Sequence, residues 1–278
     1  MRRLAVAAGI VLLATGMSYA GYRAYGRSLP EPPAVVMRDA DVKALLEPAL
    51  DTRVKQAVLG EAAGQVAGPK LIALTFDDGP YPVDTPVLLA TLRAAHVQAT
   101  FFLIGRDAEQ YPGLVRAIAA DGNEIANHTE THPNLDELDP AAVTAELSAD
   151  VATLTRLVPQ RDPMYAREFR PPHGRFTPET LVAAQQAGYD TILWTDDPGD
   201  WRNVSRDVLA DHIARYATSP EIVLLHNGRP ETVALLPDMI QRFRNAGYTF
   251  LTVSELLRRV GPDALNHAAR TPLPPQNS

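Results

Sequence analysis

Seven short apolar segments recur along this chain, each separated from the next by a stretch long enough for a helix. Apolar runs of this length, bounded by turn residues, are typical of buried strands. Strands that alternate with helices form a parallel sheet with the helices outside. About seven such strands in under two hundred residues predict an α/β fold, a short and distorted (β/α) barrel. The segments lie at 71–76, 100–104, 124–126, 168–170, 191–194, 222–225 and 248–253.

Cap signals mark the helices between these strands. An N-cap side chain followed by proline at the first helical position is typical of a helix start, and glycine suits the left-handed residue that ends a helix. The expected starts are Thr85-Pro86, Asp139-Pro140 and Thr177-Pro178, and the expected ends are Gly122, Gly188 and Gly247.

Two adjacent carboxylates end the first strand. The sequence Thr-Phe-Asp-Asp-Gly-Pro at 75–80 places Asp77 and Asp78 after a buried apolar run, where like charges disfavour each other's ionised forms. A divalent cation would justify the pair if one carboxylate binds the ion and the other stays free as a proton acceptor. On its own, Asp-Asp-Gly-Pro is typical of an ordinary turn.

His128 and His132 supply the further ligands that such a cation needs. Their His-x-x-x-His spacing predicts that both imidazoles lie on one side of a helical turn, a geometry that chelates zinc. The same spacing is common on surface helices, so the interpretation depends on both motifs together. With Asp78, the two histidines would form a site of two nitrogens and one oxygen that leaves a position open for water.

Three more polar motifs follow later strands: Arg-Pro-Pro-His-Gly at 170–174, Asp-Pro-Gly-Asp-Trp at 197–201, and His-Asn at 226–227. Every motif begins at the C-terminal end of a strand, where parallel α/β barrels build their active sites. In this order the five motifs resemble those of the polysaccharide deacetylases, the NodB-homology group or family 4 carbohydrate esterases. The resemblance covers about residues 68–258 and implies the same irregular (β/α) barrel.

Asp78, His128 and His132 are assigned as the metal ligands. Zinc is the default ion for two imidazoles and one carboxylate, although cobalt, nickel, manganese or iron would accept the same ligands. Bound zinc lowers the pKa of water to about 7. Asp77 is the expected general base, and Arg170 is expected to hold it ionised by depressing its pKa.

His226 is the expected general acid that protonates the leaving amine, and Asp200 would orient it and favour the imidazolium. Trp201 and Leu224 are expected to wall a substrate pocket for the acetyl methyl, although residues of these types belong by default to a core.

Two positions depart from the family pattern. Family members commonly carry Tyr where this chain has His173, and the backbone N–H at that position contributes the oxyanion donor. A main-chain donor survives replacement of the side chain, so substrate stacking is what the change affects. Asn227 stands where Asp is usual, which removes a charge next to His226. His96, His212 and His267 lie away from every motif and are interpreted as solvated surface residues.

The chain ends carry other signals. Arg2 and Arg3, the apolar run 4–14 and Ser-Tyr-Ala at 18–20 predict a signal peptide over 1–20, or an uncleaved membrane anchor through 4–20, and hence export to the periplasm or the outside. We expect a proline-rich linker and short helices over 21–67, a catalytic domain over 68–258 and a tail over 259–278. A net charge of −7 without a basic run excludes nucleic-acid binding. We expect a monomer.

The leading function is metal-dependent deacetylation of N-acetylglucosamine polymers such as peptidoglycan or chitin-like chains. Two alternatives stay open: an O-deacetylase of acetylxylan-type esters with the same site, and a glycan-binding pseudoenzyme that kept the fold. A complete set of acid, base and ligands argues against the pseudoenzyme, since a binding module has no use for them.

Overall fold

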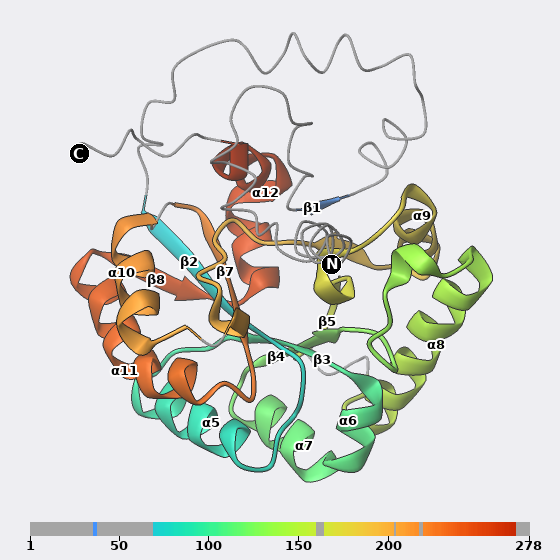
Figure 1. Cartoon of the computed structure of the whole chain (residues 1–278), viewed down its shortest axis with the longest axis horizontal. Helices are drawn as coiled ribbons and strands as arrows, with labels where there is room; N and C mark the ends of the chain where they lie inside the picture. Colours follow the sequence, from blue (N-terminus) through green and yellow to red (C-terminus); the bar gives the residue numbers. More distant parts are fainter. Residues whose placement is uncertain (1–35, 38–68, 160–163, 203, 217–218, 271–278) are drawn as a thin grey trace, which may run out of the picture.

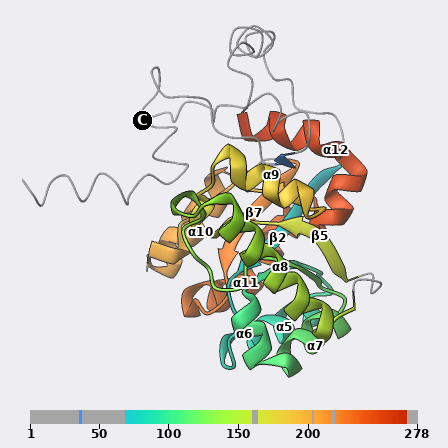
Figure 2. The ribbon, with the colours of Figure 1, turned by 90° about the vertical axis from the view of Figure 1, so that its right-hand side faces the viewer.

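Parallel strands curl around a common interior and helices cover their outer face (Figures 1 and 2). The computed structural model describes residues 36–37, 69–159, 164–202, 204–216 and 219–270. The predicted (β/α) barrel is confirmed, with each of the seven expected strands present in the order β6-β5-β4-β3-β2-β7 and with β8 beside β2. The strands are β1 (Val36–Met37), β2 (Lys70–Asp77), β3 (Thr100–Leu103), β4 (Glu124–Asn127), β5 (Tyr165–Phe169), β6 (Asp190–Ile192), β7 (Glu221–His226) and β8 (Tyr248–Leu251).

The sheet is closed unevenly around β2. One edge of β2 pairs with β7, while the other edge pairs with β8 along its first half and with β3 along its second half. On the far side, Asp196 follows β6 and forms a parallel bridge to Val223 of β7, which completes the ring. The short β1 pairs with β6 and is antiparallel to it. This pattern explains the distortion of the barrel, because two strands share one edge of β2.

Alternate residues along each strand face two different cores, as the period of a strand requires. Phe101 on β3 packs outward with Phe76 among the helices, whereas its neighbour Phe102 faces inward. The inner cluster takes a residue such as Ala73 or Ile222 from each long strand and is completed by the start of α12. Both faces of the strands are thus buried, which explains why their sequences read as continuous apolar runs.

The predicted caps hold except for one. Asp139 and Thr177 accept the N–H groups of Ala142 and Thr180 and cap α8 and α9, and all three expected C-terminal glycines have positive φ. Thr85 was expected to cap α5, but that prediction is wrong because the helix already begins at Asp84. The helices are α5 (Asp84–Ala94), α6 (Gly105–Gln110), α7 (Pro112–Ala120), α8 (Pro140–Leu157), α9 (Pro178–Gln186), α10 (Arg206–Tyr216), α11 (Pro230–Asn245) and α12 (Val253–Arg270), with short 3₁₀ turns η2 (Leu135–Glu137), η3 (Pro172–Gly174) and η4 (Asp200–Arg202).

Several sequence predictions concern segments near the chain ends. The signal peptide or anchor over 1–20 lies outside the described residues, as does the linker over 21–67 apart from β1. At the other end, α12 continues to Arg270, past the expected domain end at 258. Among the described helices, none is both long and apolar enough to cross a membrane.

Candidate metal centre and catalytic site

The five motifs meet at one end of the barrel, at the carboxyl ends of the strands. Asp77 is the last residue of β2 and His226 the last of β7, and the two are register partners on neighbouring strands. His128 directly follows β4, and Arg170 directly follows β5. Residues separated by about 150 positions in sequence therefore become neighbours because their strands are parallel and in register.

Asp78 faces both histidines that were assigned as metal ligands. Its Oδ1 lies 3.2 Å from Nε2 of His132 and 3.7 Å from Nε2 of His128. Asp78 has a φ of 70°, a left-handed conformation that aspartate tolerates better than most residues. Asp77 pairs with Arg170 through its Oδ1, whereas Asp78 faces the two imidazoles, so the two adjacent aspartates have different partners.

The loop that carries the histidines is not helical, and the predicted helical turn is wrong. Residues 128–134 follow β4 without regular structure, and Thr129 and His132 have φ values of 68° and 62°. The Thr129 hydroxyl accepts the N–H of His132, while the Thr129 and Glu130 carbonyls accept N–H groups from Gly105 and Arg106. Left-handed backbone, which is costly for a β-branched residue such as Thr129, brings the two imidazoles together in place of a helix.

The three ligands fit a divalent ion. Their ligand atoms all lie within 4.8 Å of one another. Asp78 Oδ1 is buried and accepts no hydrogen bond, so it lacks the partner that a buried carboxylate requires. Nδ1 of His128 donates to the Arg170 carbonyl at 2.8 Å, which leaves Nε2 free of a proton, and burial lowers the His128 pKa to about 3. A neutral imidazole with a free Nε2 is the form that binds metal.

Asp77 forms a buried ion pair with Arg170, as the sequence predicted. Nη1 of Arg170 donates to Asp77 Oδ1 at 2.6 Å, and both side chains are almost inaccessible to solvent. The expected fall in pKa does not follow. Burial raises the pKa of Asp77 above its ordinary value, and the opposing effects of Arg170 and His226 are smaller. A raised pKa brings this carboxylate closer to what a general base near neutral pH requires.

Each of the three guanidinium nitrogens of Arg170 donates at least one hydrogen bond. The guanidinium donates to the Thr75 hydroxyl at 2.8 Å and to the carbonyls of Ile192 and Leu193, and it stacks 4.0 Å from the ring centre of Phe102. Thr75 was not among the predicted site residues. Its position two residues before Asp77 on the same strand face was the available signal.

His226 is held by Asp200, also as predicted. Its Nδ1 donates to Asp200 Oδ1 at 2.7 Å, and its backbone N–H donates to the other oxygen at 2.8 Å. Thr232, which the sequence analysis did not single out, donates to that second oxygen at 2.7 Å. Burial alone would lower the His226 pKa, but the hydrogen bond and charge of Asp200 raise it to about 9. At neutral pH the imidazole is therefore protonated, and Nε2 is left to carry the transferable proton.

The three expected substrate-binding residues have different surroundings. His173 is exposed, has a φ of 59° and places its ring edge-on to that of His132, with 4.5 Å between ring centres. Leu224 is buried on the same strand face as His226, two residues earlier. Trp201 is partly buried, and its indole N–H donates to Asp197. His173 thus adjoins His132, a predicted metal ligand, and Leu224 lies two residues before His226, the predicted acid, on β7.

Asn227 fastens the turn that follows the two aspartates. Its amide exchanges hydrogen bonds with the Thr85 hydroxyl, which also accepts the N–H of Tyr81. The Asn227 N–H donates to the Asp77 carbonyl at 2.8 Å. This network explains why Thr85 does not cap α5 and gives the departure at Asn227 a structural function.

A further correction concerns His212, which was interpreted as a surface residue but forms a hydrogen bond with Asp196 at 2.6 Å.

Sequence comparisons place this arrangement among known proteins. Residues 64–192 match the family model described as polysaccharide deacetylase. A peptidoglycan-N-acetylglucosamine deacetylase of Bacillus cereus is 38% identical over 194 residues, which are 68% of this chain and 89% of that protein. A chitooligosaccharide deacetylase of Bradyrhizobium sp. is 38% identical over 167 residues, which are 60% of this chain and 75% of that protein.

Solved structures agree with the sequence comparisons. A family 4 carbohydrate esterase from Streptomyces lividans, in complex with acetate, matches with a TM-score of 0.60 at 30% identity and covers 65% of this chain and 91% of its own. A family 4 pseudoenzyme from Bacillus anthracis matches with a TM-score of 0.64 at 30% identity, over 68% of this chain and 66% of its own. Similarity of fold thus extends to active and inactive proteins, so activity depends on the site residues.

Proposed function

This chain belongs to the polysaccharide deacetylase family, and from that membership we propose that it is a metal-dependent hydrolase that removes N-acetyl groups from polymers of N-acetylglucosamine. One observation carries the proposal. At one end of the barrel, the buried Asp77 lies 3.8 Å from Nε2 of His128, one of three clustered side chains that could hold a metal ion, and is the register partner of His226. The B. cereus and Bradyrhizobium relatives, which are named for deacetylation of such glycans, support the choice of substrate class.

Asp78, His128 and His132 would hold the divalent ion, which is zinc by donor type. The ion supplies Lewis acidity that favours deprotonation of water at neutral pH. Asp77 takes the proton of the attacking water with its Oδ2, because its Oδ1 is occupied by Arg170. Arg170 keeps that carboxylate in one orientation through its contacts with Thr75 and two carbonyls.

His226 donates its Nε2 proton to the leaving nitrogen as the carbon–nitrogen bond breaks. Asp200 fixes the ring through Nδ1 and raises the His226 pKa to about 9, so the ring is protonated at neutral pH. The backbone N–H at His173 is the proposed oxyanion donor, and Leu224 and Trp201 are proposed to adjoin the acetyl group. His226 thus acts from the protonated state that Asp200 favours.

The function is tested by measuring acetate release from peptidoglycan, chitooligosaccharides, poly-N-acetylglucosamine and acetylxylan, with Asp77→Asn as the matched inactive control. We expect turnover on the N-acetylated glycans. The Asp77→Asn variant should lower kcat by about 10² or more, the usual scale for loss of a general base, and should retain the metal. Release from acetylxylan alone would favour the O-deacetylase, and no release from any substrate by the metal-loaded protein would favour a pseudoenzyme. An Asp77→Asn variant that loses metal but regains turnover when metal is restored would reverse the functions of Asp77 and Asp78.

Export is a second part of the proposal, supported by the charged and apolar segments at 2–14 and the small residues at 18–20. Residues 1–35 fused to a reporter that is active only after export should give a signal. Sequencing of the mature amino terminus then separates cleavage after Ala20 from an uncleaved anchor. An intact fusion that stays in the cytoplasm and gives no signal would contradict export.

A further inference from the structure

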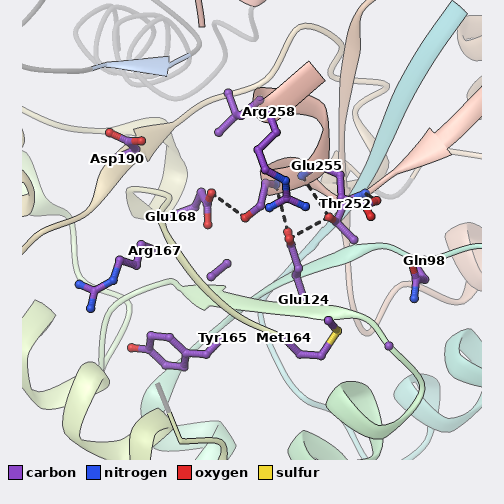
Figure 3. A pocket seen from close by; sticks show the side chains of 14 residues that line it. Gln98, Glu124, Met164, Tyr165, Arg167, Glu168, Asp190, Thr252, Glu255 and Arg258 are labelled. Atoms are coloured by element: carbon purple, nitrogen blue, oxygen red, sulfur yellow. Dashed lines mark hydrogen bonds between the residues drawn. The ribbon is translucent and has the colours of Figure 1, made fainter. Parts of the chain in front are cut away.

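A cavity of about 600 Å³ lies at the opposite end of the barrel from the catalytic groups (Figure 3). Its walls come from the amino-terminal ends of β4, β5 and β6 and from the start of α12. Ligand pockets typically measure roughly 300–1,000 Å³. Four carboxylates and two guanidinium groups are among the lining residues: Glu124, Glu168, Asp190, Glu255, Arg167 and Arg258.

Glu124 has a structural function in this cavity. One carboxylate oxygen accepts the Thr100 hydroxyl at 2.9 Å and the Ser254 N–H at 3.2 Å, and the other accepts the Thr252 hydroxyl at 2.8 Å. Its charge lies at the amino terminus of α12, where a negative group is favourable. Glu124 therefore holds α12 against the barrel, and both of its carboxylate oxygens already accept hydrogen bonds from the protein.

Glu168 is different, because half of its carboxylate has no partner. The side chain belongs to a residue only 6% exposed, and Oε1 accepts the Ser254 hydroxyl at 2.8 Å. Oε2 is buried and accepts no hydrogen bond. Burial and the nearby Glu124 raise the pKa of Glu168 to about 7. A buried carboxylate oxygen of this kind has no donor among the described residues and can accept one from a ligand.

We propose that this cavity binds an amino sugar, whose primary ammonium group donates to Glu168 Oε2. A lone pair of the Ser254 hydroxyl can accept from the same ammonium, which has three donors to place. A metal ion fits less well, since Asp78, His128 and His132 form the only three-ligand cluster among the described residues.

The rim of the cavity suits the hydroxyl groups of a sugar. Figure 3 shows Arg258 reaching from α12 towards Glu124, with Arg167 and Asp190 on one side of Glu168 and Gln98 on the other. The carboxylates outnumber the guanidinium groups, so a cationic ligand matches the charge of the walls. The inference rests on the proposed function, because removal of acetyl from N-acetylglucosamine leaves a glucosamine unit with this ammonium group. The cavity would therefore recognise the product of the catalytic site at the other end of the barrel.

Calorimetric titration of glucosamine at pH 7 tests the site, with glucose as the matched ligand that lacks the ammonium. We expect wild type and Asp78→Ala to bind glucosamine equally, because the catalytic site is not involved. Glu168→Gln should weaken binding by about ten- to a hundredfold, the scale of one charge-assisted hydrogen bond, and should leave acetate release unchanged. Glu109→Gln, which removes an exposed carboxylate on α6, is the control.

Each other outcome has a meaning. Loss of binding in Asp78→Ala but not in Glu168→Gln would place glucosamine in the catalytic site and overturn the inference. So would equal binding of glucose, or displacement of glucosamine by millimolar Ca²⁺. If Glu168→Gln does not fold, amide shifts of the wild type replace it: glucosamine should move those of 166–168 and 252–258, and shifts elsewhere alone would contradict the site. Acetate release without glucosamine binding would contradict only the proposed amino-sugar site and would leave the proposed deacetylase function supported.

Discussion

Purified protein should contain about one divalent ion per chain, and His128→Ala, His132→Ala and Asp78→Ala should each remove it and abolish acetate release. This result is expected because the three ligand atoms share one site and the buried Asp78 Oδ1 has no other partner. Metal analysis after dialysis gives the stoichiometry. The wild type should also melt at a lower temperature after chelation, since an ion that binds only the folded state stabilises it, whereas the variants should show no such shift.

His96→Ala is the control for these variants. His96 is exposed and has a φ of 50°, so alanine there carries the same kind of backbone strain as at His132, where φ is 62°. The control should retain metal and activity. Equal metal content in the wild type and all three ligand variants would show that Asp78, His128 and His132 are not the metal ligands.

His226→Ala should lower amide hydrolysis by about 10²- to 10⁴-fold, the contribution of a general acid, and should lower hydrolysis of an activated aryl acetate much less. An amine must be protonated to leave, whereas an aryloxide leaves without this help. Comparison of kcat/KM on chitooligosaccharide and aryl acetate measures the difference. Equal losses on both substrates, with fold and metal intact, would mean that His226 is not the acid.

Asp200→Asn should show the same selectivity in milder form, with a change in pH dependence. Because Asp200 raises the His226 pKa to about 9, the imidazolium is present at neutral pH and is lost as the pH rises through that value. The substitution removes this effect, so the alkaline fall in kcat should move to lower pH. An unchanged pH profile would show that Asp200 does not act through the protonation of His226.

The strand positions and the location of the site could be predicted from the sequence because burial on both faces leaves continuous apolar runs that end in polar motifs. Asp77, Asp78, Arg170 and His226 lie at strand ends for that reason. The pairing of Asp77 with Arg170 and of His226 with Asp200 followed from the family resemblance and agrees with the geometry.

The remaining features depend on tertiary contacts that local patterns do not contain. The helical turn predicted for His128 and His132 failed because hydrogen bonds from Gly105 and Arg106 stabilise a left-handed loop. The Asp77 pKa is raised and not lowered because the effect of burial outweighs that of the Arg170 charge. Thr232 on α11 donates to Asp200, 32 residues away in sequence, and no spacing rule predicts that contact.

The pairing of β2 with β7 also determines the order in which the chain can assemble. β2 begins the barrel and contributes Asp77, yet β7, its partner along one edge, is not made until residues 221–226. The Thr75 hydroxyl donates to the Val223 carbonyl across 148 positions. Closure over such separations slows folding, and until it occurs β2 presents an open edge on which other chains can pair. During synthesis the three proposed metal ligands are thus present long before His226, and β7, in the last quarter of the chain, closes the sheet around them.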